Sequence, residues 1–113
     1  VHIEHHGDVI VWGDVNPGSM VSATGDVLIF GTLRGIAHAG MDLIDPRGSV
    51  VIALSLRALQ VRIGPFICNP GKSSDRKGRF NPKIAYSENG SIVIDTYRGD
   101  LTQRLIEGGS DDR

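Results

Sequence analysis

The fold is decided by the stretch Gly7-Asp8-Val9-Ile10-Val11-Trp12-Gly13-Asp14-Val15, which recurs in kind as Gly25-Asp26-Val27-Leu28-Ile29-Phe30-Gly31-Thr32-Leu33. The first copy begins at Gly7 and the second at Gly25, and apolar, small and acidic residues stand at matching places. We call this spacing, from position 7 to position 25, the long period. A fixed period of this kind is the sequence signature of repeat architectures.

A finer period of six lies inside the longer one. Counting in sixes from one start gives an unbroken apolar series: Ile3, Val9, Val15, Val21, Val27, Leu33 and Ala39. Counting from another gives small residues: Gly7, Gly13, Ser19, Gly25, Gly31 and Ala37. The apolar residue begins a short strand, and the small residue marks a corner where a side chain would obstruct the bend.

Three sides of this length return the chain over its own start, about 4.8 Å higher. The sequence therefore predicts an all-β triangular solenoid of about three coils, with parallel strands and sides 7–12, 13–18 and 19–24 stacked under 25–30, 31–36 and 37–42. An antiparallel sandwich is the alternative, but it predicts hairpin turns at irregular spacing.

The register is lost after Gly40 and resumes later. A turn-rich insertion over 42–48 precedes apolar strands at 50–54 and 59–63, which would form the third coil. Residues 68–82 are rich in Pro, Gly, Ser and basic residues and are predicted to form a loop. Apolar runs around Asn89-Gly90 predict a closing hairpin.

Composition limits the classes of function. Lys and Arg total 12 against 13 for Asp and Glu, so no broad basic surface for nucleic acid or anionic lipid is expected. The single cysteine, Cys68, excludes an internal disulfide and suits a reducing compartment. No apolar run approaches the roughly 20 residues that span a bilayer. We expect a piece of a longer cytoplasmic protein, with residues 1–97 as the β domain and 98–113 as a short helix or disordered tail.

One outward side is apolar. Once the inward register is fixed, Ile10 and Leu28 point outward from adjacent coils, with Trp12 and Phe30 near the corner. A large apolar patch on a protein surface usually marks an interface, and a two-fold dimer is the self-complementary choice. The alternative is that a later segment of the chain covers this side.

The next side is polar and flat. It exposes Asp14, Asn16, Thr32 and Arg34, flanked by Gly18 and Gly35. From the residues alone, a face that is simply solvated is the favoured interpretation. A partner-binding face is the alternative, because the glycines would let a partner approach the backbone closely.

The sequence shows no catalytic or cofactor-binding motif. His2, His5 and His6 lie near Glu4, but alternate residues of a strand point to opposite sides and would not converge on zinc. We therefore expect no metal and no cofactor.

The enzyme alternative is a left-handed hexapeptide-repeat acyltransferase, with His38 as the base. Its motif wants a small or acidic residue where this chain has Ile10 and Leu28, so the fit is poor.

The residues from Gly7 to Gly40 also carry a family resemblance. Asp-Val-Asn-Pro-Gly at 14–18 and Leu-Arg-Gly-Ile-Ala-His-Ala-Gly at 33–40 resemble the C-terminal domain of the MinC family of septum-site-determining proteins, most of all its cyanobacterial type. The resemblance continues loosely over 56–63.

This resemblance implies a right-handed β-helix that homodimerises through one face and docks on the MinD ATPase through its polar face. In this sequence that polar face consists of Asp14, Asn16, Gly18, Thr32, Arg34 and Gly35. It implies a division inhibitor that reaches the inner face of the cell membrane only through MinD. Antagonism of FtsZ would belong mainly to a separate N-terminal domain outside these residues. The family's Arg-Ser-Gly-Gln motif, which contributes to MinD binding just before the first coil, has no counterpart in this sequence.

Overall fold

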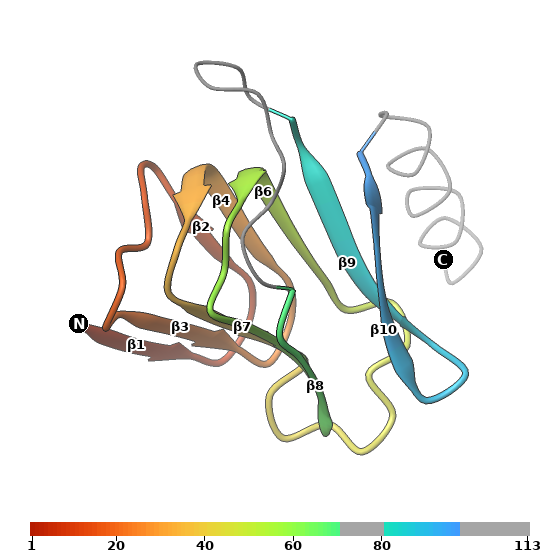
Figure 1. Ribbon diagram of the computed structural model, residues 1–113. Coiled ribbons are helices and arrows are strands. Elements are labelled where there is room, and N and C mark those ends of the chain that lie inside the picture. The colour runs from red at the N-terminus through yellow and green to blue at the C-terminus, as the bar shows by residue number, and fades with distance from the viewer. Residues whose placement is uncertain (71–80, 98–113) are drawn as a thin grey trace, which may run out of the picture.

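The computed structural model describes residues 1–70 and 81–97, within which the regular elements are all β-strands. They are β1 (His2–His5), β2 (Val9–Val11), β3 (Met20–Ala23), β4 (Val27–Leu33), β5 (Ile36–Ala39), β6 (Val50–Leu56), β7 (Gln60–Ile63), β8 (Phe66–Cys68), β9 (Lys83–Glu88) and β10 (Ser91–Thr96). The described strands form two five-stranded sheets, ordered β1-β3-β5-β7-β8 and β10-β9-β6-β4-β2. The chain alternates between the sheets from β1 to β7, and the β9–β10 hairpin stands at the end opposite the N-terminus (Figure 1).

The long period sets the register on two of the three predicted sides. Strand β2 lies parallel to β4, with Val9 beside Val27, and an isolated parallel bridge joins Val15 to Leu33. Both pairs have the same spacing in sequence as Gly7 and Gly25, so this part of the prediction is confirmed.

The third side differs from the expected stacking of 19–24 under 37–42. Strand β3 pairs with β5 so that Met20 lies beside Ile36, whereas the long period would have placed Met20 beside His38. The chain needs four residues to pass from Val15 to Met20, because Asn16-Pro17-Gly18-Ser19 forms a turn closed by a 3.0 Å bond from the Ser19 amide to the Asn16 carbonyl. The equivalent corner after Leu33 needs only two residues.

The predicted insertion before the third set of strands is confirmed. Val27 of β4 pairs with Val51 of β6, and Ile36 of β5 pairs with Gln60 of β7, so both partners lie further along the chain than the long period would place them. The extra residues lie in the loop between β5 and β6. Pro46 of this loop is buried and packs closely against Gly64: a Cβ built on Gly64 would lie 2.6 Å from the Pro46 Cγ.

The C-terminal strands make both sheets mixed. Strand β8 pairs antiparallel with β7, and β9 pairs antiparallel with β6 and β10. The predicted hairpin is confirmed, and its turn residues Asn89 and Gly90 have φ angles of 51° and 80°, as a two-residue hairpin turn requires. The predicted loop over 68–82 is wrong at its start, because Cys68 ends β8; residues 71–80 lie outside the described part, as do 98–113.

The core lies between the two sheets and follows the predicted apolar series. Fully buried members include Val27, Leu33 and Ala39, at 0% exposure. Val9 is only partly buried on the outermost strand β2, and the prediction is wrong for Ile3, which is 43% exposed on the outermost strand β1. Inward residues of β3, β4, β5, β6, β7 and β9 join one continuous cluster. A single strand pair could not bury that surface, so stability comes from stacking.

Aspartates tie neighbouring strands together at one corner. Asp8 Oδ1 accepts a 2.8 Å bond from the Asp26 amide, and Asp26 Oδ1 accepts a 2.9 Å bond from the Val50 amide. Burial raises the pKa of the Asp26 carboxyl, the Val50 amide lowers it, and the charge of Asp8 raises it further, with a net rise.

This raised pKa predicts the effect of an Asp26→Asn substitution. The native state holds the Asp26 proton more tightly than the unfolded chain, so its stability falls as pH rises from near 3.8 through the raised pKa. Asparagine keeps an oxygen for the Val50 amide and carries no charge. We expect Asp26→Asn to be as stable as the parent or up to about 1 kcal/mol more stable at pH 7, with no gain at pH 3.

Urea unfolding at the two pH values measures this difference. Asp26→Ala is the control, because it also removes the acceptor: it should be about 1 kcal/mol less stable than Asp26→Asn at both pH values. An Asp26→Asn variant less stable than the parent at pH 7 would contradict the account.

Candidate protein-binding surfaces

A row of apolar residues crosses the outer side of β2, β4 and β6 in the second sheet. Strand pairing places Ile10 beside Leu28, and Leu28 beside Ile52 of β6. Ile10 is 53% exposed, while Leu28 and Ile52 are half-buried. The stacking of Ile10 on Leu28 is as predicted, and Ile52 continues the same row. In the described ranges no strand of the chain pairs with the free edge of β2, so Ile10 stays open.

Two aromatic residues extend this surface to the corner. Trp12 and Phe30 stack with ring centroids 4.7 Å apart and planes at 13°, although Trp12 is 83% exposed and Phe30 43%. Stacking holds the indole in place without burying it. We call Ile10, Trp12, Leu28, Phe30 and Ile52 the apolar face; Ile52 is the member that the sequence analysis missed, because the insertion shifts its repeat position.

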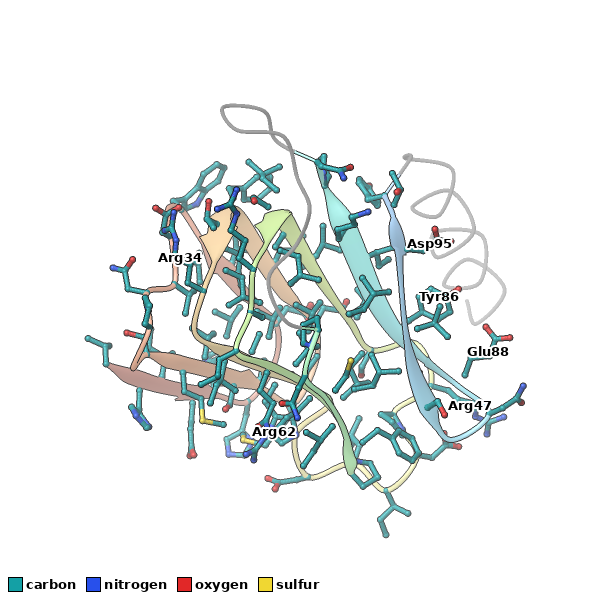
Figure 2. The ribbon with its side chains drawn as sticks, in the orientation of Figure 1. Arg34, Arg47, Arg62, Tyr86, Glu88 and Asp95 are labelled. Carbon is teal, nitrogen blue, oxygen red and sulfur yellow. The ribbon has the colours of Figure 1, made fainter. Side chains whose placement is uncertain are left out.

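The adjoining polar face is organised by Asp14. Its Oδ1 accepts a 2.7 Å bond from the Thr32 amide, and its Oδ2 lies 3.7 Å from a guanidinium nitrogen of Arg34. Both side chains of the ion pair are about half exposed. The Asp14 carboxylate thus joins two segments that are stacked on each other, 13–15 and 31–34. The Arg34 side chain lies at the edge of the molecule (Figure 2).

The other predicted members of this face are placed differently. Asn16 and Gly18 are exposed in the turn between Val15 and β3, as expected. Thr32 was expected to be exposed but is buried at 9% exposure, since it lies between Asp14 and its paired residue Ser55. Gly35 is also buried.

The packing of the backbone requires glycine at position 35. A Cβ there would meet the carbonyl oxygens of Asn16 and Ser19, so stacking of the chain excludes any larger residue. Two residues that the sequence analysis did not assign to this face also lie beside it. Arg57 is exposed, and Leu59 is 65% exposed with its amide bonded to the carbonyls of Arg34 and Gly35.

The described residues contain no group of three or more His, Cys, Asp or Glu side chains placed to hold a metal. His38 Nε2 lies 3.0 Å from the Gly64 carbonyl and so is engaged with the backbone. No helix within the described ranges has the length and apolar character to cross a membrane.

The chain matches known proteins along most of its length. The model of the family "Septum formation inhibitor MinC, C-terminal domain" matches residues 1–97. A relative from Acetivibrio thermocellus is 39% identical over 84% of this chain and 41% of its own length, and one from the cyanobacterium Synechocystis sp. is 45% identical over 85% and 37%. Each is named probable septum site-determining protein MinC, and this chain spans less than half of either.

The fold also matches a solved structure. A chain of the MinC:MinD cell division protein complex from Aquifex aeolicus superposes with a TM-score of 0.70 and 33% sequence identity, covering 96% of this chain and 87% of that one. With the family match over both sheets, these similarities show that the chain belongs to the family of MinC C-terminal domains.

Proposed function

We propose that this chain is a non-enzymatic domain of a cell division inhibitor that homodimerises and binds the MinD ATPase. Through MinD it is held at the inner face of the cell membrane, and the whole protein blocks FtsZ ring assembly away from midcell. The observation that carries the proposal is the similarity to a chain of the MinC:MinD complex over nearly the whole length. We assign the antagonism of FtsZ mainly to the part of the family protein that lies outside this domain.

The apolar face supports the dimer. Its exposed members, Ile10, Trp12 and Phe30, stand in one outward patch with Leu28 beneath them. Burial across a two-fold axis would contribute about 1.5–3 kcal/mol for each well-covered apolar side chain. In a monomer these apolar side chains would stay in contact with water, and that stabilising free energy would not be gained.

The ion pair of Asp14 and Arg34 supports the MinD-binding face. Arg34 presents a planar, permanently charged group that suits a carboxylate or a backbone carbonyl of a partner. Asp14 limits the rotamers of that group before binding, which lowers the entropy lost on association. Asn16 and Gly18 flank it, and the buried Thr32 and Gly35 shape the backbone beneath.

The parallel pairing of Val9 with Val27 and of Val15 with Leu33 supports a right-handed triangular β-helix within residues 1–97. Parallel strands of one sheet are joined by right-handed crossovers in nearly all proteins, which is the general ground for the hand.

Replacing Arg34 by Glu tests the partner face. We expect Arg34→Glu to keep the β signal and the dimer while its affinity for MinD falls about tenfold or more, since a central interface arginine commonly contributes about 2 kcal/mol. The measurement is co-sedimentation with MinD and ATP, beside size-exclusion chromatography.

Arg47→Glu is the matched control, because Arg47 is exposed at the other end of the molecule from Arg34 (Figure 2). It should bind MinD as the parent does. Equal binding by parent and Arg34→Glu would move the contact to the first sheet, around Met20.

A further inference from the structure

The turn of the β9–β10 hairpin consists of an asparagine followed by a glycine. Asn89 and Gly90 are both exposed and have φ angles of 51° and 80°. The last strand pair before the turn is Glu88 with Ser91, so neither turn residue belongs to the paired strands. Within residues 1–70 and 81–97 the Asn89 side chain forms no hydrogen bond. Its amide group is therefore open to water and is not held in place.

The residue that follows distinguishes Asn89 from the other asparagines of the chain. The sequence contains four asparagines, and three of them, Asn16, Asn69 and Asn81, are each followed by proline. Proline has no backbone N–H. A backbone nitrogen that can lose a proton and attack the preceding side chain is therefore present only after Asn89, where glycine adds no side chain to obstruct it.

We propose that Asn89 is a site of spontaneous deamidation, which converts it to a mixture of aspartate and isoaspartate. The Gly90 nitrogen attacks Cγ of Asn89, the new C–N bond closes a succinimide ring, and the side-chain nitrogen leaves as ammonia with the proton of the Gly90 amide. Water then opens the ring. Cleavage of the bond from nitrogen to Cγ gives aspartate, and cleavage of the bond from nitrogen to the main-chain carbonyl carbon gives isoaspartate. Water is the only other reactant.

The structure leaves room for the ring to close. Nothing lies within 4 Å of a Cβ built on Gly90, so the space around the attacking nitrogen is open. Rotation of Asn89 breaks no bond of the strand ladder, because the ladder ends at Glu88 and Ser91. Local opening at the exposed tip of a hairpin costs little free energy compared with opening of the core.

The two products differ in their effect on the hairpin. Asp-Gly suits a two-residue hairpin turn as Asn-Gly does, so aspartate at position 89 keeps the turn. In isoaspartate the main chain runs through Cβ and Cγ, which adds an atom to the backbone of the turn. The pairing of Glu88 with Ser91 depends on a two-residue turn, so we expect isoaspartate to loosen this end of the sheet.

Both products add the same negative charge. Asn89 lines a hollow of about 460 Å³ together with Asp45, Arg47 and Glu88. Arg47 and Glu88 lie at the same end of the molecule (Figure 2), and Arg47 already contacts both carboxylate oxygens of Asp45. A new carboxylate therefore stands next to Glu88 without a free cation among these groups. The charge is common to both products, so the altered turn can be measured separately.

The experiment incubates the folded chain at mildly alkaline pH and maps the products by peptide mass spectrometry. Isoaspartate is counted by methyl transfer from S-adenosylmethionine with an isoaspartyl methyltransferase. The reference is the free peptide of residues 83–96. We expect the folded chain to form isoaspartate at position 89 at a rate within about tenfold of the peptide, which corresponds to an opening free energy below about 1.4 kcal/mol. A folded chain that reacts more slowly than this would overturn the proposal.

Two variants are the matched controls. Asn89→Gly has no side-chain amide and keeps a Gly-Gly turn, so it should fold as the parent does and form no isoaspartate there. Asn89→Asp supplies the charge alone. The isoaspartate fraction of the incubated parent should unfold about 4–8 °C below Asn89→Asp, because only that fraction has the longer turn. Isoaspartate in Asn89→Gly at the level of the parent, or equal unfolding temperatures for isoaspartate and Asn89→Asp, would contradict the account.

Discussion

A Gly31→Ala variant should unfold about 12–24 °C below the parent protein, the shift that corresponds to a loss of about 3 kcal/mol in a domain of this size. The added Cβ would meet the Gly13 carbonyl oxygen and would lie 2.5 Å from the carbonyl carbon. Both contacts are with backbone atoms of Gly13, in the segment stacked against Gly31, so no side-chain rotation relieves them. The measurement is thermal unfolding followed by circular dichroism.

Gly13→Ala separates this steric effect from the conformational preference of glycine. Gly13 has a φ of 138°, but nothing lies within 4 Å of a Cβ built there. Only the strain of a positive φ remains, and we expect a loss of about 1 kcal/mol. Equal losses in the two variants would show that close stacking is not what requires glycine at Gly31.

The period identified the core because inward positions obey a strict physical rule. Each inward side chain must be apolar and must stack on its neighbour, so Val9 over Val27 and Val15 over Leu33 followed from spacing alone. The glycines at the corners followed the same six-residue period, because a side chain there would obstruct the bend. These features depend on local steric demands that repeat along the chain.

Features that depend on a single turn could not be predicted in this way. The Asn16–Ser19 turn lengthens one corner and shifts the pairing of β3, and no repeat signals that shift. Strand β8 is short and forms through pairing with β7, so its propensity was hidden in a Pro- and Gly-rich stretch.

For the candidate sites, the sequence predicted which side chains point outward but not which contacts they make. Alternation placed Ile10 and Arg34 outward, but it did not reveal that Asp14 bonds the Thr32 amide. It also did not show that Gly35 is required by the carbonyls of Asn16 and Ser19. Such contacts join residues of neighbouring coils in three dimensions, and a pattern of residue types does not encode their geometry.

The Leu28→Asp variant should be a folded monomer whose dimer dissociation constant is at least about 100-fold weaker than that of the parent, a change of about 2.7 kcal/mol. Leu28 lies between Ile10 and Ile52 in the middle row of the apolar face, so a carboxylate there would be buried without a partner in the proposed interface. Because Leu28 is half-buried and outward in the monomer, its replacement leaves the core residues Val27 and Ile29 in place. Light scattering after size exclusion measures the mass.

Trp12 gives an independent readout, because it is the single tryptophan and is 83% exposed in the isolated chain. Association through the apolar face should bury its indole and shift the emission of the parent to the blue as concentration rises, whereas Leu28→Asp should show no shift. Ile67→Asp, which places the same charge on β8 of the other sheet, should behave as the parent in both measurements. If Leu28→Asp instead elutes as a dimer and Trp12 emission still shifts, the two chains meet through the corner at Trp12 and Phe30 rather than through the row of Ile10, Leu28 and Ile52.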